Sequence, residues 1–310
     1  MNRKFIGVLL LMFFSLRCIY AEQIIIPVIF SSHLEPYEQD WKGCREFFRE
    51  SKMTVGFSEY YLDKKKPEII CSEINRQKSR LVIVLGTGAL KLAKERIENI
   101  PIVFSLVLEP EEIAASNTNI TGVNMDIPSR MKLEEIKRIF PNIKRVGMIY
   151  SPRTGSVYRE ILPAAKEMNI QLVAREINSE KEFPQALEEI FSQVDCFLMV
   201  ADSKIYFPRS VQYLLLESLK KKIFLIGLSS FYTRAGALLS FDCDYKDLGK
   251  QTGEVALRIL NGEKPSDLQF VRPRKFVISL NLLIAKRLGI VIPSGIIQEA
   301  SEVVGEESWE

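Results

Sequence analysis

The stretch LVIVLGTGALKLAKERI, residues 81–97, places a strand, a polar turn and a helix in direct succession. Leu81 to Leu85 is an unbroken apolar run, which is typical of a buried parallel strand, and Ala89 to Ile97 has the pattern of a helix. The turn between them is Gly86-Thr87-Gly88. A turn of this kind directs free backbone N–H groups and the positive end of a helix at one point, which suits a carboxylate or a phosphate. We therefore expect Gly86, Thr87 and Gly88 to contact an anionic ligand group, the alternative being a plain strand-to-helix turn.

The same arrangement recurs along the chain and predicts an α/β fold. Strand-like and helix-like segments alternate throughout, which argues for parallel sheets. In an open α/β sheet, ligands bind beyond the carboxyl ends of the strands. Eight further polar residues follow apolar runs or the turns after them, and we predict that they line the ligand site: Ser31, Ser32, Ser105, Ser151, Ser156, Asp202, Ser229 and Asp242.

Several of these polar residues also have a purely structural interpretation. Ser151 and Ser156 are placed to cap the helix that begins near Val157. Asp202 either accepts a hydrogen bond from a ligand amine or hydroxyl, or caps the following helix. Asp242 either contacts the ligand or orders the turn that follows it. The sequence leaves these alternatives open.

The first residues have the pattern of a secretory signal peptide. Arg3 and Lys4 form a basic start, and the apolar run FIGVLLLMFFSL from residue 5 to residue 16 is short for a membrane span. Ala21 would end a cleavage site, so that the mature chain begins at Glu22. The alternatives are an uncleaved anchor and a lipoprotein attached through Cys18, which Arg17 disfavours because a small residue usually precedes the lipidated cysteine.

Charge and cysteine content exclude two classes of protein. The formal charge of +3 comes from residues 1–21, since the remainder has 42 − 3 = 39 basic and 39 acidic residues. A balanced chain gives no electrostatic reason to expect nucleic-acid binding. The four cysteines after residue 21 show no metal-ligand spacing. We expect no pairing of Cys44 with Cys71, and we leave a disulfide between Cys196 and Cys243 open.

Two successive series of strands and helices predict two Rossmann-like lobes with parallel sheets, joined by a hinge of several short crossovers. The first series starts with a strand at Ile24–Phe30, and the second starts after Pro128. The predicted organisation is a signal peptide at 1–21, lobe 1 at 22–124 plus 246–272, lobe 2 at 125–245 plus 273–298, and a flexible tail at 299–310.

Four segments of the chain resemble one protein family. They are IVLGTGALKLAKERIENIPIVFS at 83–105, NITGVNMDIP at 119–128, PNIKRVGMIYSP at 141–152, and RAGALLSFDCDYKDLGKQTGEVALRILNGEKPSD at 234–267, which is followed by FVISLNLLIAKRLGIVIP at 276–293. The chain resembles the periplasmic substrate-binding proteins of ABC importers that have a type I periplasmic-binding fold, in the tryptophan/tyrosine-binding-like branch.

This resemblance implies a two-lobed binder that closes on a small polar molecule, an amino acid or a related compound, and delivers it to a membrane permease. The family often has an acidic residue after the strand that here ends at Gly227, where this chain has Leu228-Ser229-Ser230. It often has Asp-Asn where this chain has Asp202-Ser203. A ligand amine would need an acceptor, and Asp202 remains available for that role.

The preferred interpretation is a monomeric, exported solute-binding protein in the periplasm or outside the cell, with a small molecule and a permease as its partners. The alternative is a periplasmic sensing module that feeds a membrane signalling receptor. We do not expect an enzyme, a cofactor or a metal: His33 is the only histidine, no G-x-S-x-G motif occurs, and Lys91 breaks the dinucleotide pattern G-x-G-x-x-G. Aromatic residues near loop starts are candidates for stacking on a ligand: Tyr37, Tyr206, Phe207 and Phe231.

Overall fold

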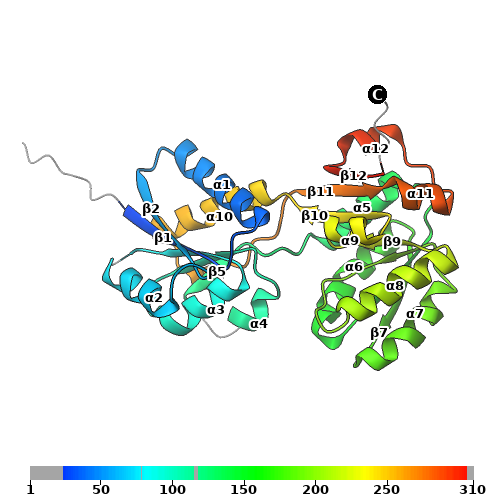
Figure 1. Cartoon of the computed structure of the whole chain (residues 1–310), viewed down its shortest axis with the longest axis horizontal. Coiled ribbons are helices and arrows are strands. Elements are labelled where there is room, and N and C mark those ends of the chain that lie inside the picture. Colours follow the sequence, from blue (N-terminus) through cyan, green and yellow to red (C-terminus); the bar gives the residue numbers. More distant parts are fainter. Residues whose placement is uncertain (1–23, 78, 115–117, 306–310) are drawn as a thin grey trace, which may run out of the picture.

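The computed structural model describes residues 24–77, 79–114 and 118–305, and within them it forms two β-sheets (Figure 1). The strands of the first sheet are all parallel, in the order β2-β1-β3-β4-β5. We call this sheet, its helices and the later helix α10 lobe 1. Its elements are β1 (Ile24–Phe30), α1 (Glu35–Glu50), β2 (Val55–Tyr61), α2 (Pro67–Arg76), β3 (Val82–Leu85), α3 (Thr87–Arg96), β4 (Ile102–Ser105), α4 (Pro110–Ala114) and β5 (Ile120–Gly122).

The second sheet has the order β12-β11-β10-β9-β8-β6-β7, and we call it and its helices lobe 2. Neighbouring strands are parallel except for β10 and β11, so that β11 and β12 both run opposite to the other five. The elements up to α8 are α5 (Ser129–Ile139), β6 (Arg145–Tyr150), η1 (Pro152–Thr154), α6 (Gly155–Glu167), β7 (Gln171–Glu176), η2 (Glu180–Glu182), α7 (Phe183–Phe191), β8 (Cys196–Leu198) and α8 (Pro208–Lys221). The rest are β9 (Phe224–Gly227), α9 (Ser230–Ala235), β10 (Leu239–Cys243), β11 (Phe276–Asn281), α11 (Leu282–Leu288), α12 (Ser294–Glu299) and β12 (Glu302–Val304).

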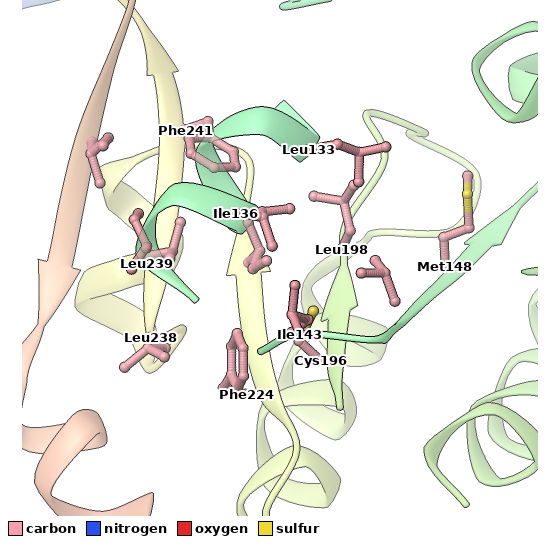
Figure 2. Close-up of a cluster of buried hydrophobic side chains, with 14 of the residues drawn as sticks. Leu133, Ile136, Ile143, Met148, Cys196, Leu198, Phe224, Leu238, Leu239 and Phe241 are labelled. Atoms are coloured by element: carbon pink, nitrogen blue, oxygen red, sulfur yellow. The ribbon is translucent and has the colours of Figure 1, made fainter. Parts of the chain in front are cut away.

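Each sheet is covered by helices on both faces, which explains why its strands are apolar on both sides. In lobe 1, α1 and α10 cover one face, and α2, α3 and α4 cover the other. In lobe 2, Leu133 and Ile136 of α5 pack over Leu198 and Phe241 of the sheet (Figure 2). Helices α7 and α8 cover the opposite face.

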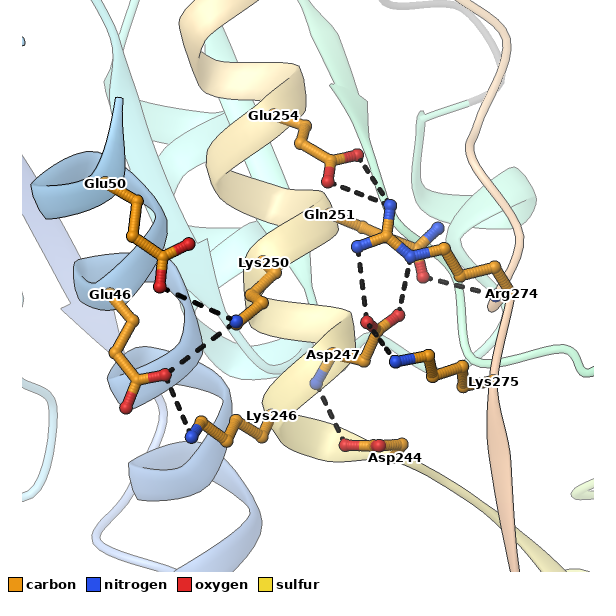
Figure 3. A network of polar contacts seen from close by, with 10 residues as sticks. All are labelled: Glu46, Glu50, Asp244, Lys246, Asp247, Lys250, Gln251, Glu254, Arg274 and Lys275. Atoms are coloured by element: carbon orange, nitrogen blue, oxygen red, sulfur yellow. Dashed lines mark hydrogen bonds and ion pairs between the residues drawn. The ribbon is translucent and has the colours of Figure 1, made fainter. Parts of the chain in front are cut away.

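Helix α10 (Tyr245–Leu260) follows a strand of lobe 2 but packs on α1 of lobe 1. Glycines permit this close crossing. A Cβ atom added at Gly249 would lie 1.7 Å from the carbonyl oxygen of Asp40, and one added at Gly43 would lie 1.9 Å from that of Lys246. Lys246 and Lys250 also pair with Glu46 across the two helices (Figure 3). The crossing therefore fixes the connection from β10 of lobe 2 to α10 on the surface of lobe 1.

Arginines fasten the last connection between the lobes, near Pro273. Val271 still bridges to Val123 beside β5. Arg272 then pairs with Asp126 and, at 2.7 Å, with Glu160 of α6 in lobe 2. Arg274 reaches back to lobe 1, where its guanidinium lies 2.8 Å from both Asp247 and Glu254 of α10 (Figure 3). The additional 3₁₀ turn before this connection is η3 (Pro265–Asp267).

The structure differs from the sequence-based expectations in one strand and in the tail, and it decides a cysteine pairing that the sequence left open. Strand β11 adds an antiparallel strand to sheets that we expected to be parallel, because the chain enters lobe 2 from the hinge in the opposite direction to β10. Residues Glu302–Val304, expected in a flexible tail, form β12, because β11 offers them an edge with which to pair. Cys196 and Cys243 do not form a disulfide; Cys44, Cys71, Cys196 and Cys243 are all free and buried.

Two expectations are not decided by the fold. The predicted signal peptide at 1–21 lies outside the described residues, and residues 306–310 of the predicted tail do as well. The exact lobe boundaries stay a prediction. Among residues 24–77, 79–114 and 118–305, no helix combines the length and the apolar character needed to cross a membrane.

Candidate ligand-binding site

The carboxyl ends of β1 and β3 bring Ser31, Gly86, Thr87 and Gly88 together, as the sequence predicts. Ser31 Oγ accepts a hydrogen bond from the backbone N–H of Ala89 at 2.8 Å. The N–H of Gly86 donates to the carbonyl oxygen of Ser105 at 2.9 Å. Of the turn's N–H groups, those of Thr87 and Gly88 have no acceptor among the hydrogen bonds of the described residues. These two groups, at the start of α3, are the donors that a ligand anion can use.

Gly86 is required at this turn because of its backbone and its neighbours. Its φ of +96° is unfavourable for residues with a side chain, and a Cβ atom there would lie 2.6 Å from both Ser31 Oγ and Tyr37 Oη. Burial raises the pKa of Tyr37, against a smaller opposing effect of the nearby Ser32 and Ser31 side chains. Ser32 thus joins this group through Tyr37, which the sequence identified only as an aromatic candidate.

Ser105 lies at the end of β4, but its side chain does not reach the surface where a ligand would bind. It is fully buried, and its Oγ donates to Oδ2 of Asp40 at 2.6 Å. Asp40 is itself fully buried, and its Oδ1 has no hydrogen-bond partner among the residues that the structure describes. Burial raises the pKa of Asp40 to about 7, against a smaller opposing effect of the Ser105 hydroxyl. Ser105 supports a buried carboxyl group, a role that its position in the sequence does not reveal.

In lobe 2, Asp202 holds the ends of β6 and β8 together. Its Oδ2 accepts from Ser151 Oγ at 2.6 Å, from Thr154 Oγ1 at 2.7 Å and from the N–H of Ser151 at 3.2 Å. Its Oδ1 accepts from the N–H of Lys204 at 3.0 Å. The sequence correctly brings Ser151 and Asp202 to one place, but the carboxylate is largely satisfied by the protein itself. Thr154 completes this cluster, and only its place in the polar turn after β6 could have indicated it.

Asp242, at the end of β10, has more capacity for a ligand. Its Oδ1 accepts from Tyr245 Oη at 2.6 Å and from the N–H of Cys243 at 2.9 Å. Among the described residues, its Oδ2 has only the N–H of Ser230 as a donor, at 3.4 Å. Burial raises the pKa of Asp242, against the lowering effect of these donors. Asp242 is therefore a dehydrated carboxyl group with one oxygen that is weakly bonded.

The remaining predicted residues lie at the same edge of the second sheet or just beyond it. Ser229 is the partly buried N-cap residue of α9, and its carbonyl accepts from the N–H of Tyr232 at 2.9 Å. Ser156 is exposed in the first turn of α6. The strand order β10-β9-β8-β6 places Asp242, Ser229, Asp202 and Ser151 in that sequence along the edge.

The carboxyl edges of the two lobes touch through charged residues that the sequence did not single out. Glu109, in the loop between β4 and α4, lies 2.8 Å from Arg153 Nη2 of lobe 2. Ser203 Oγ donates to the same carboxylate at 3.2 Å, and Glu112 also pairs with Arg153. These contacts bring the ends of β4, β6 and β8 face to face. The sequence held no signal for them because the partners are 44 and 94 residues apart.

Aromatic and apolar side chains lie around these edges. His33 stacks on Tyr61 with ring centroids 3.9 Å apart, and both belong to lobe 1. Leu34, Leu108 and Phe231 are 56 %, 60 % and 63 % exposed. Tyr206 is not a ligand candidate, because its hydroxyl points to the carbonyl of Ile149 in its own lobe. Within the described part of the chain, no group of three or more His, Cys, Asp or Glu side chains could hold a metal ion.

Comparison with known proteins identifies the family. The sequence model of the ABC transporter substrate binding protein family matches residues 52–304. The chain belongs to this family. Its members bind substrates rather than convert them, and the resemblance found in the four sequence segments is confirmed.

Two curated proteins are similar in sequence to a large part of this chain. The tyrosine-binding protein of Clostridioides difficile is 24 % identical over 225 residues, which are 69 % of this chain and 64 % of that protein. An uncharacterized protein of Rickettsia prowazekii is 27 % identical over 222 residues, with 70 % of both chains covered. The chain thus spans about two thirds of the length of these relatives.

The solved structures support the two-lobed fold. A ligand-free, open substrate-binding protein with adhesive properties from Clostridium difficile matches with a TM-score of 0.69 and 20 % identity, over 90 % of this chain and 99 % of that one. An ABC domain from Streptococcus pneumonia in complex with L-Trp matches with a TM-score of 0.59 and 21 % identity, over 91 % and 100 %. At these identities the likeness establishes the fold alone.

Proposed function

We propose that the protein binds a small aromatic amino acid between the carboxyl edges of its two lobes and delivers it to the permease of an ABC importer. One observation carries the proposal: unfilled backbone donors remain on the lobe 1 edge, and a partly filled carboxylate remains on the lobe 2 edge. A zwitterionic amino acid has the complementary pair of groups, a carboxylate and an amine.

In this proposal, the lobe 1 edge binds the ligand carboxylate. The N–H groups of Thr87 and Gly88 have no acceptor in the described part of the chain, and they begin a helix of ten residues. Thr87 Oγ1 already accepts from the N–H of Leu108 at 3.2 Å, and its hydroxyl hydrogen is available to the same anion. A helix start with free N–H groups favours a negative charge.

The lobe 2 edge supplies the acceptor for the amine, and Asp242 suits this role better than Asp202. Within the described residues, Asp202 accepts from four protein donors, whereas Oδ2 of Asp242 has a single long contact. A buried carboxylate with spare capacity gains a charge-assisted hydrogen bond when an ammonium group arrives. Asp242 therefore replaces Asp202 as the proposed acceptor.

The side chains around the edges favour an aromatic group on the ligand. Leu34 and Leu108 of lobe 1 and Phe231 of lobe 2 each expose more than half of their surface. A ligand ring between such side chains would cover apolar surface that water now contacts. The names of relatives support the same class, since one is a tyrosine-binding protein and another was solved with L-Trp.

We further propose that residues 1–21 direct export and are removed, which puts the binding site on the side of the membrane where an importer collects its substrate. N-terminal sequencing of the mature protein should begin at Glu22. A chain that retains Met1, or one that carries a lipid on Cys18, would contradict cleavage at this place.

Calorimetry with three related ligands tests the site: L-tyrosine, desaminotyrosine, which lacks the amine, and tyramine, which lacks the carboxylate. In the Asp242→Asn variant, affinity for L-tyrosine and tyramine should fall by about 10-fold or more, because a charge-assisted hydrogen bond is lost. Affinity for desaminotyrosine should stay unchanged.

The matched control is Asp244→Asn, which alters the N-cap of α10 and should affect all three ligands equally or not at all. If Asp242→Asn weakens desaminotyrosine as much as L-tyrosine, Asp242 acts through Tyr245 on the hinge and not on the amine. If neither L-tyrosine nor L-tryptophan binds the parent protein, the proposed ligand class is wrong.

A further inference from the structure

Arg153 is the centre of a charged contact that joins the two lobes away from the hinge. Its guanidinium reaches Oε2 of Glu109 at 2.8 Å and also pairs with Glu112, both from lobe 1. Ser203 of lobe 2 adds hydrogen bonds to both oxygens of Glu109, at 3.2 Å and 3.3 Å. Among the contacts of the described residues, the other links between the lobes lie at the connections between them, which are the segments from β5 to α5, from β10 to α10, and around Pro273.

The loop of lobe 1 that carries Glu109 is held in an unusual conformation. Leu106 and Glu109 have φ values of +55° and +50°, which are uncommon for residues with side chains. Leu108 is tied to the start of α3, because its N–H donates to Thr87 Oγ1. The loop thus connects Arg153 mechanically to Thr87, one of the proposed ligand-binding residues.

Lobe 2 holds Arg153 in place in a similar way. The N–H of Arg153 donates to Ser151 Oγ at 3.3 Å, and Ser151 Oγ donates to Asp202. The Arg153 side chain is 23 % exposed, against 29 % for Glu109. A partly dehydrated ion pair is stronger than an exposed one and still responds to salt.

We propose that Arg153 is a positioning residue for ligand binding: it draws the Glu109 loop to lobe 2 and holds the two carboxyl edges at a separation close to the one that a ligand bridges. The lobes then lose less conformational freedom when the ligand binds, which raises affinity. The effect of Arg153 on the distance between the lobes is independent of the ligand, whereas its effect on ligand affinity rests on the proposed function.

The first test measures the lobes without any ligand. Nitroxide labels on Lys91→Cys in lobe 1 and Arg209→Cys in lobe 2 report the interlobe distance by double electron–electron resonance. The cysteines of the described residues are all buried. Arg153→Gln should lengthen and broaden the distance distribution. The parent protein should approach this distribution in 1 M salt, where the screening length is about 3 Å, while Arg153→Gln responds little.

Two variants separate a positioning role from a general structural one. Arg130→Gln removes an ion pair with Glu167 that lies within lobe 2, and it should leave the distance unchanged. The charge-reversed pair Arg153→Glu with Glu109→Arg should restore part of the short distance, which neither single variant does. An unchanged distance in Arg153→Gln, or no rescue by the reversed pair, would overturn the proposal.

Ligand affinity gives the second test, with L-tyrosine as the probe. Arg153→Gln should weaken binding several-fold, with the loss recovered in the reversed pair. If the distances change as expected but L-tyrosine does not bind the parent protein, the contact stands and the proposed function fails. If L-tyrosine binds all variants equally, the contact does not position the edges for the ligand.

Discussion

Asp40 in lobe 1 and Asp202 in lobe 2 are carboxyl groups buried behind the strand ends of their sheets, at 0 % and 3 % exposure, and they are held in opposite ways. Asp202 accepts four hydrogen bonds from Ser151, Thr154 and Lys204. In the described part of the chain, Asp40 accepts one hydrogen bond from Ser105, and its Oδ1 has no partner. A buried charge is tolerated where donors surround it and is costly where they do not. In lobe 2, the Asp202 carboxyl group therefore organises the ends of β6 and β8 through its hydrogen bonds. In lobe 1, the Asp40 carboxyl group has few donors, and burial raises its pKa to about 7.

The largest expected effect in this comparison is the contribution of Asp40 to the pH dependence of the protein's free energy of unfolding. The unfolded group has a pKa near 3.8, and burial raises the folded value to about 7. Between these values folding takes up a proton, so the contribution of Asp40 to stability falls as pH rises, by about 1.4 kcal/mol per pH unit. It levels off above pH 7. Asp40→Asn should match the parent near pH 4 and exceed its stability by about 4 kcal/mol at pH 8.

Denaturant unfolding of both proteins at several pH values measures this difference. Asp63→Asn, on the exposed surface, is the matched control and should leave the pH profile of the parent unchanged. A profile for Asp40→Asn that parallels that of the parent from pH 4 to pH 8 would show that the Asp40 carboxyl ionises normally. The contrast with Asp202 would then be lost.

The second effect concerns Asp202, whose removal leaves buried donors without an acceptor. Asp202→Ala should lower the free energy of unfolding by about 3 kcal/mol, because Ser151 and Thr154 lose their common partner. Asp63→Ala is the matched control. The unfolding midpoint in urea is the measurement, and a shift no larger than that of the control would mean that the cluster at the ends of β6 and β8 does not depend on this carboxylate.

The smallest effect concerns one hydrogen-bond donor of the lobe 1 edge in ligand binding. Thr87→Ala removes one hydroxyl from the lobe 1 edge and should weaken L-tyrosine and desaminotyrosine several-fold, at a cost of about 1 kcal/mol. Tyramine, which lacks the carboxylate, should bind as before. Thr54→Ala, at an exposed position before β2, should change nothing. Equal losses for tyramine and L-tyrosine would place the carboxylate elsewhere.

Local sequence patterns sufficed for most of the strands, for the turns and for the two-lobed fold, but not for β11 and β12. The run from Leu81 to Leu85 and the turn at Gly86 have one reasonable conformation, because apolar periodicity and the need for a positive φ act over a few residues. The same reasoning brought Ser31, Thr87, Ser151 and Asp202 to strand ends, since parallel strands collect their carboxyl ends at one edge. Helix α3 began two residues earlier than expected, at Thr87, because the glycine turn is shorter than its composition suggests.

Only the tertiary structure decided which polar atoms remain free. Ser105 and Thr87 look alike in the sequence, yet Ser105 turns inward to Asp40 and Thr87 lies at the edge. Asp202 has its lone pairs filled and Asp242 does not, which depends on neighbours such as Thr154 and Tyr245. The contact of Arg153 with Glu109 and the pairing of β12 with β11 likewise join distant segments. Hydrogen bonds and ion pairs between residues far apart in the sequence are sensitive to differences in distance of a few tenths of an ångström. The packing of the whole folded chain sets these distances.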